Sequence, residues 1–108
     1  MAFNPQLAIR IRTQLDLFPE AIIEKRMFGG VSFLYKGKMT VGIVKEDLAV
    51  RIVSDKMEVE LAKASVRPMD FTKRRIQEFV YVSANGFKTE SQLLYYIELG
   101  LEHAKSKL

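Results

Sequence analysis

The first apolar positions of the chain recur with the spacing of an α-helix. Four of them lie on one helical face, namely Leu7, Ile11, Leu15 and Phe18. Asn4 is a residue type that caps helix N-termini, and Pro5 suits a first turn because the N–H that it lacks would have no helical partner there. The pattern therefore predicts a helix over residues 5–18, which Pro19 ends.

From residue 21 the apolar positions alternate with polar ones, which is typical of half-buried β-strands. Residues 22–35 are predicted as one long strand that contains two adjacent glycines. Lys36 and Gly37 supply the turn to a second strand, and the "KEDL" segment supplies the turn to a third. The inward positions are Val31, Phe33, Tyr35, Met39, Val41, Ile43, Leu48, Val50 and Ile52. Short connections of this kind predict a three-stranded antiparallel meander.

A second helix is expected over residues 54–64, with Ser54 as its N-cap. Two further apolar runs, "SVRPMDF" and "EFVYVS", are predicted as short strands joined by an exposed basic loop, "TKRRIQ". Pro68 cannot donate a backbone hydrogen bond, so the strand that contains it is expected at an edge of the sheet.

The last helix has the clearest signal in the chain. Thr89 and Gln92 match the capping-box pattern, in which each side chain bonds the other residue's backbone N–H. A wide apolar stripe follows at Leu93, Leu94, Ile97, Leu101 and Ala104. We expect this stripe to pack on the sheet face formed by Val31, Phe33, Val41, Ile43 and Val50.

The expected order of elements is α-β-β-β-α-β-β-α, without an internal repeat. This order predicts a single two-layer α+β domain over residues 1–108, in which helices pack on an antiparallel sheet of about five strands. The first helix is expected on the same face of the sheet as the last.

Composition and charge narrow the functional classes. Hydrophobic residues make up 48% of the chain and charged residues 28%, which is ordinary for a globular domain. The absence of cysteine excludes a disulfide scaffold, a thiolate zinc site and a cysteine nucleophile, and it agrees with a reducing compartment. The N-terminal segment matches neither a signal peptide nor a membrane span, so a cytoplasmic protein with no membrane partner is expected.

The paired glycines at positions 29 and 30 raise the question of a phosphate-binding loop. A P-loop requires Gly-Lys-Ser/Thr at the start of a helix, whereas a strand pattern follows Gly30. Glycine within a strand pattern more often marks a bulge or a close backbone approach. We therefore expect Gly29 or Gly30 to adopt a backbone conformation that a β-carbon would oppose, and to bend the long first strand.

No other residue set predicts a reaction. His103 has no second histidine or cysteine with which to share a metal, and it lies in the last turn of the last helix, where it is interpreted as structural. The acidic residues of the second helix, including Glu58 and Glu60, are interpreted as a solvated face. We expect no enzyme activity, no cofactor and no metal.

Basic residues provide the remaining candidates. Lys25 and Arg26 stand beside the paired glycines, and the expected loop contributes Lys73, Arg74 and Arg75. With a formal net charge of +4, these five side chains are candidate contacts for an anion or a nucleic acid.

Several motifs resemble one known family. The segments "KRMFGG", "YKGKM" and "KEDLAVRI" are similar to the TfoX N-terminal domain family, and "RPMDF", "FVYVS" and the last helix extend the similarity more weakly. The carried-over motif positions are Lys25, Arg26, Met27, Phe28, Gly29 and Gly30. The resemblance implies a two-layer α+β fold and a relation to TfoX or Sxy regulators of natural competence, which act with the cAMP receptor protein on DNA-uptake genes. It implies no catalytic residues.

Two functional hypotheses follow. The first is a non-catalytic regulatory domain of a bacterial protein that binds another protein, as a monomer or a homodimer. The alternative is a small nucleic-acid-binding module that uses the basic loop from Lys73 to Arg75, with Lys25 and Arg26 in support.

Overall fold

The computed structural model describes residues 3–27, 29–71 and 74–108. The helices are α1 (Pro5–Leu15), α2 (Ser54–Leu61) and α3 (Glu90–Ser106), and a 3-10 turn, η1 (Ala84–Phe87), precedes α3. The strands are β1 (Ile22–Met27), β2 (Gly30–Tyr35), β3 (Lys38–Val44), β4 (Asp47–Arg51), β5 (Val66–Phe71) and β6 (Arg74–Val82).

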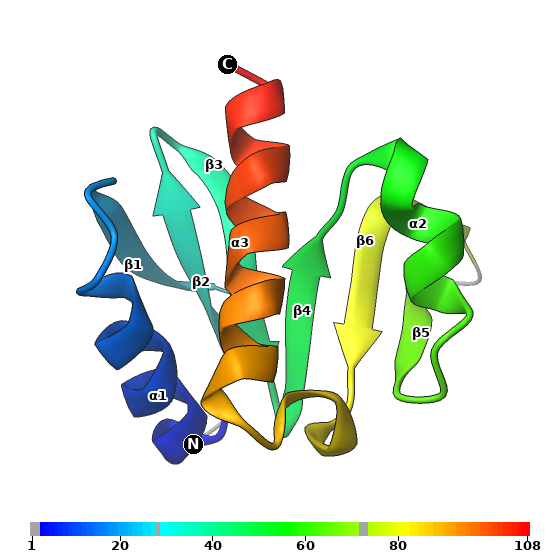
Figure 1. Ribbon diagram of the computed structural model, residues 1–108, viewed down its shortest axis with the longest axis horizontal. Coiled ribbons are helices and arrows are strands. Elements are labelled where there is room, and N and C mark those ends of the chain that lie inside the picture. The colour runs from blue at the N-terminus through cyan, green and yellow to red at the C-terminus, as the bar shows by residue number, and fades with distance from the viewer. Residues whose placement is uncertain (1–2, 28, 72–73) are drawn as a thin grey trace.

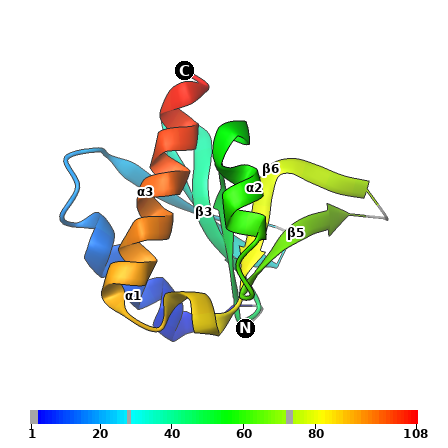
Figure 2. The same ribbon diagram turned by 45° about the vertical axis from the view of Figure 1, so that its right-hand side comes forward.

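The strands form one antiparallel sheet in the order β1-β2-β3-β4-β6-β5. The three helices lie on the same face of this sheet, with α3 across its centre and α1 and α2 on either side (Figures 1 and 2). The predicted α+β class is therefore confirmed, with six strands in place of about five. Pro68 lies on β5, at an edge of the sheet as expected.

The extra strand arises at the paired glycines. The prediction of one bent strand over residues 22–35 is wrong, because β1 turns back on β2 and Met27 pairs with Gly30. Gly29 has φ +77°, and a β-carbon at Gly30 would overlap the carbonyl oxygen of Ile43. The expectation that a side chain would be opposed here is confirmed, but its cause is a hairpin and not a bulge.

Other predicted boundaries need smaller corrections. The expected basic loop over residues 72–77 is wrong at Arg74 and Arg75, which belong to β6 and pair with Phe71 and Asp70. Lys73 lies outside the described residues, as does Phe28. The second helix begins at Ser54 but its N-cap is Val53, so the predicted cap at Ser54 is also wrong.

The core lies between α3 and the sheet, as the apolar stripe predicts. Leu93, Ile97 and Leu101 are buried on α3. The sheet positions expected beneath them are all buried, and they form one cluster with Leu93 and Ile97 that does not include Leu101: Val31, Phe33, Val41, Ile43 and Val50. Helix α1 adds Leu7 and Ile11 to this cluster and thus shares the face.

A close backbone approach brings α3 onto the centre of the sheet. A β-carbon at Gly100 would overlap the carbonyl group of Thr40 on β3. Glycine at this position therefore lets the helix backbone approach the strand more closely than any other residue would allow.

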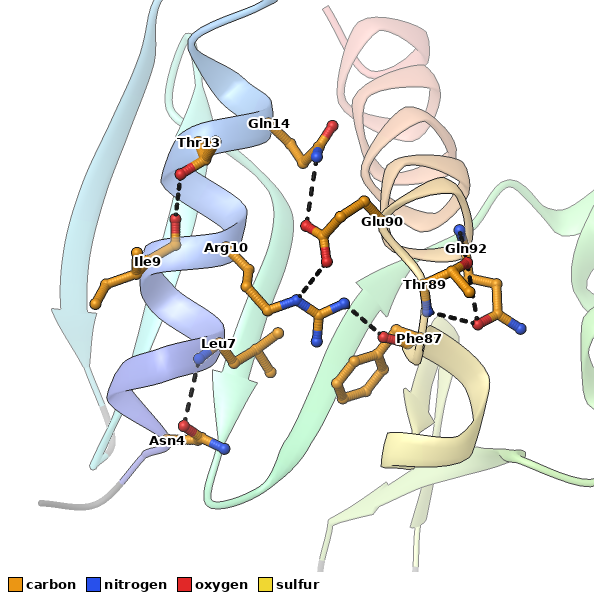
Figure 3. A network of polar contacts seen from close by, with 10 residues as sticks. All are labelled: Asn4, Leu7, Ile9, Arg10, Thr13, Gln14, Phe87, Thr89, Glu90 and Gln92. Carbon is orange, nitrogen blue, oxygen red and sulfur yellow. Dashed lines mark hydrogen bonds and ion pairs between the residues drawn. The ribbon is translucent and has the colours of Figure 1, made fainter.

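Polar contacts attach α1 to the start of α3. The Arg10 Nε donates to Glu90 Oε1 at 2.8 Å, and another nitrogen of the same guanidinium donates to the carbonyl of Phe87 at 2.7 Å (Figure 3). The expected caps are also present, with Asn4 Oδ1 accepting from α1 amides and Thr89 forming a capping box with Gln92. The first-turn amides of both α1 and α3 thus have side-chain hydrogen-bond partners.

We predict that Ile97→Ala lowers the free energy of unfolding by about 2–5 kcal/mol, because it removes buried methyl and methylene groups and leaves a cavity. The control is Glu98→Ala at the adjacent exposed position, with an expected change below about 0.5 kcal/mol. Urea titrations measure both values. Equal, small losses in the two variants would contradict the helix-on-sheet core.

We predict that Gly100→Ala destabilises the protein by about 1–3 kcal/mol, although alanine favours helices, because the added methyl group forces α3 away from Thr40. The same urea titrations measure this change. A more stable Gly100→Ala variant would show that the helix does not require this close approach.

Candidate functional site

The basic residues beside the hairpin point to opposite faces of the sheet. Lys25 pairs with Ser32, whereas Arg26 pairs with Val31, which belongs to the core. The Arg26 guanidinium lies 5.6 Å from the ring centroid of Phe3, on the side of the helices. Lys25 and Arg26 therefore do not converge on one ligand.

The second basic group lies far from the first. Arg74 and Arg75 are on β6, and β1 is separated from β6 by β2, β3 and β4. At the usual spacing of about 4.8 Å between strands, this separation is about 19 Å. The far ends of β5 and β6 also extend away from the helices (Figure 2). The candidates that the structure describes, Lys25, Arg26, Arg74 and Arg75, therefore do not form one site.

The sheet has a second face that carries no helix among the described residues (Figure 1). One row of paired residues crosses all six strands on this helix-free face: Lys25, Ser32, Gly42, Ala49, Tyr81 and Arg67. The Arg67 guanidinium lies 4.9 Å from the Tyr81 ring centroid and forms an ion pair of 2.5 Å with Asp47. Small residues thus occupy the middle of the face, with an aromatic residue and charged residues beside them.

A polar cluster around Glu78 joins β6, α2 and α3. The Oε2 atom of Glu78 accepts from the backbone N–H of Ser54 at 3.2 Å and from its hydroxyl at 2.7 Å. The Oε1 atom lies 3.1 Å from Lys107 Nζ and 3.3 Å from His103 Nε2. Val53, the N-cap of α2, makes no side-chain hydrogen bond to the helix. The carboxylate of Glu78 on β6 therefore takes the place of a cap, because it accepts from a backbone N–H in the first turn of α2.

Glu78 adopts φ +60°, which is unfavourable for a residue with a β-carbon. Its backbone is still hydrogen-bonded, since the carbonyl accepts from the N–H of Ile52, which follows β4, at 3.0 Å. The surrounding contacts therefore hold this residue in a sparsely populated conformation.

The electrostatics of the cluster follow from these contacts. The hydrogen bonds from Ser54 and then from Lys107 lower the pKa of Glu78 to about 2. Burial lowers the pKa of His103, and the bond to Glu78 opposes this shift. Burial also lowers the pKa of the Arg51 guanidinium.

An open cleft of about 390 Å³ lies beside this cluster, lined by Gly37, Lys38, Met39, Arg51, His103 and Lys107. Lys38 comes from the start of β3 and Arg51 from the end of β4, whereas His103 lies in the last turn of α3 and Lys107 is the C-cap of that helix. Basic groups from three separate elements therefore meet at one place.

A second polar cluster corrects the expectation of a solvated acidic face on α2 at Glu60, whereas Glu58 is exposed as expected. Glu60 is only 1% exposed, and its Oε2 accepts from the Tyr95 hydroxyl and lies 3.1 Å from Lys63 Nζ. Burial raises the pKa of the neighbouring Tyr96 to about 12. These contacts join α2 to α3.

Sequence reasoning missed Arg51, Glu78 and the inward role of His103. Their partners lie far away in the chain, and Glu78 is 24 residues from Ser54 and 25 from His103. No local spacing therefore marks the cluster. The weak signals were a lone histidine within an apolar stripe and a glutamate at the start of the apolar run "EFVYVS".

A family model described as the TfoX N-terminal domain matches residues 13–104, which includes every strand and most of α3. The chain belongs to the TfoX N-terminal domain family. Comparison with curated proteins and with solved structures gives no match. The match extends the recognised part of this TfoX N-terminal domain into α1, beyond the motifs that suggested it.

Two further structural findings concern the described residues of this TfoX N-terminal domain. Its described helices include none that is long and apolar enough to cross a bilayer. Within residues 3–27, 29–71 and 74–108, no three His, Cys, Asp or Glu side chains come together as a metal site would require.

We predict that Glu78 makes stability depend on pH below about 4.5. Because the folded-state pKa is lowered to about 2, the contribution of Glu78 is fully present above pH 4.5 and is lost as the pH falls toward 2. In Glu78→Gln the free energy of unfolding should decline less over this range, and at pH 7 it should be lower by about 1–3 kcal/mol.

Urea titrations at several pH values compare Glu78→Gln with the wild-type protein and with Glu98→Gln, a matched change at an exposed position of α3. Parallel pH profiles for wild type and Glu78→Gln would contradict the assigned role of Glu78.

Proposed function

We propose that this chain is a non-catalytic regulatory domain that acts by binding another protein, in the manner of TfoX and Sxy regulators. Membership of the TfoX N-terminal domain family over residues 13–104 is the observation that carries the proposal. The regulated process would then be expression of DNA-uptake genes or a related transcriptional response.

The helix-free face is the proposed contact surface. On β1, Ile23 is 65% exposed and shares this face with Lys25, two residues away. Tyr81 lies on the same face under the guanidinium of Arg67. Tyrosine and arginine are residue types that often contribute most to protein interfaces, and Ile23 adds exposed apolar surface beside Lys25.

Charge favours an acidic protein as the partner. The chain has a formal net charge of +4, and Lys25 and Arg67 stand at the two sides of the helix-free face. Asp47 forms an ion pair with Arg67 and offsets its charge, whereas the charge of Lys25 is not offset by Asp47, so these three residues together leave the helix-free face positive. A second copy of the same face would be repelled, whereas an acidic surface would be attracted and its association accelerated.

We predict that Ile23→Asp and Lys25→Glu each weaken partner binding about ten-fold or more, because one places a charge in the apolar contact and the other reverses a complementary charge. The matched control is Lys88→Glu, which makes the same charge change at an exposed position outside the sheet. Both substitutions on β1 replace exposed side chains, so the fold should persist.

Affinity capture from the native host, with the tag at either terminus, would identify proteins retained by wild type and Lys88→Glu but lost by both β1 variants. Calorimetry with the purified partner would then give the dissociation constants. Recovery of no such protein from either bait would count against the proposal. Duplex DNA binding whose affinity falls steeply with salt would instead favour the alternative that uses Lys73, Arg74 and Arg75.

A further inference from the structure

The cleft at the end of α3 has a structural origin in the sheet. The ladder between β3 and β4 ends at the pair Val41 and Val50. Beyond this pair, the start of β3 bonds only to β2, whose register shifts between Phe33 and Leu34. The two strands therefore separate where Lys38 begins β3 and Arg51 ends β4, which leaves room for the cleft.

Positive charge in this cleft exceeds the negative charge that faces it. Lys38, Arg51 and Lys107 line the cleft together with His103, and Glu78 is the carboxylate that contacts this group. Glu78 is engaged by Lys107 and His103, whereas Lys38 and Arg51 form no ion pair with any described residue. Like charges that share a site repel one another unless an anion compensates them.

Arg51 is held in place without a carboxylate. Its guanidinium carbon lies 4.7 Å from the ring centroid of Phe79, and the side chain is partly buried. Stacking on an aromatic ring fixes the plane of a guanidinium while its N–H groups stay free to donate. Arg51 is therefore oriented before any ligand arrives.

His103 is a titratable side chain that lines the cleft and contacts Glu78. The residue is 3% exposed, its Nε2 faces Glu78, and its Nδ1 is buried with no hydrogen-bond partner among the described residues. Buried polar atoms in native proteins are rarely left without a partner. When the ring is protonated, Nε2 donates to Glu78 and Nδ1 becomes a second donor.

We propose that this cleft binds a phosphate group, either free phosphate or the phosphate of a small metabolite. A tetrahedral dianion accepts from several directions, which matches donors that come from β3, β4 and α3, whereas a carboxylate offers only two oxygens. The cleft volume of about 390 Å³ suits a small ligand. Glu78 contacts both Lys107 and His103 and thereby fixes the positions of these two side chains at the cleft.

Binding is coupled to the protonation of His103. An anion near the ring favours its charged form, and the groups that face it are Glu78 on β6, Arg51 on β4, Lys38 on β3 and Lys107 on α3. Phosphate should therefore raise the pKa of His103.

Nuclear magnetic resonance on the full chain tests the proposal directly, because His103 is the only histidine and its ring Cε1 proton is a single reporter. Inorganic phosphate is titrated against sodium chloride at equal ionic strength. We expect a saturable shift of the His103 signal and a higher His103 pKa with phosphate, and neither change with chloride. Equal responses to the two salts would overturn the proposal.

Matched variants locate the site. Arg51→Gln should weaken phosphate binding about ten-fold or more, as expected for the loss of a charge-assisted hydrogen bond. Lys88→Gln is the control, since it removes a positive charge at an exposed position that lies outside the cleft. Lys38→Gln, at an exposed position, provides a second test if Arg51→Gln fails to fold. Unchanged affinity in the cleft variants would overturn the proposal.

Ribose 5-phosphate distinguishes the two sources of the phosphate group. Tighter binding of the sugar phosphate than of inorganic phosphate would support a metabolite ligand, and binding of inorganic phosphate alone would support free phosphate. Binding of neither compound would overturn the proposal.

Discussion

The contact between α3 and the centre of the sheet is the constraint on which the rest of the structure depends. Gly100 lets the helix backbone approach the carbonyl of Thr40, and Ile97 fills the space above the strands. A helix of 17 residues is about 25 Å long, so it connects opposite ends of the domain. At the start of α3, Glu90 forms an ion pair with Arg10 of α1. At its end, His103 contacts Glu78.

Glu78 joins β6 to the start of α2 and to the end of α3. Its carboxylate accepts a hydrogen bond from the N–H of Ser54 at the start of α2 and forms an ion pair with Lys107 at the end of α3. The residue itself lies on β6, which pairs with β4 and β5. The φ of +60° shows that these contacts outweigh an unfavourable backbone conformation of about 1–2 kcal/mol. The same arrangement leaves Arg51 and Lys38 without ion-pair partners among the described residues, so one local network both stabilises the fold and forms the cationic cleft.

The sequence allowed prediction of those features that local chemistry determines. The capping box at Thr89 and the apolar stripe of α3 were correct because both depend on spacing within one helix. Gly29 and Gly30 were correctly identified as conformationally special, but a turn and a bend require the same freedom, so the hairpin was missed. The Glu78 cluster was missed because its members are brought together only by tertiary packing.

Native-state hydrogen exchange tests most directly whether α3 and the sheet form one cooperative unit. The backbone amides of residues 97–101 on α3 and those of β3 and β4 should exchange only through global unfolding, with one common free energy that equals the value from urea titration. Exchange of the α3 amides through an opening with a clearly smaller free energy than that of β3 would contradict the central role of this contact.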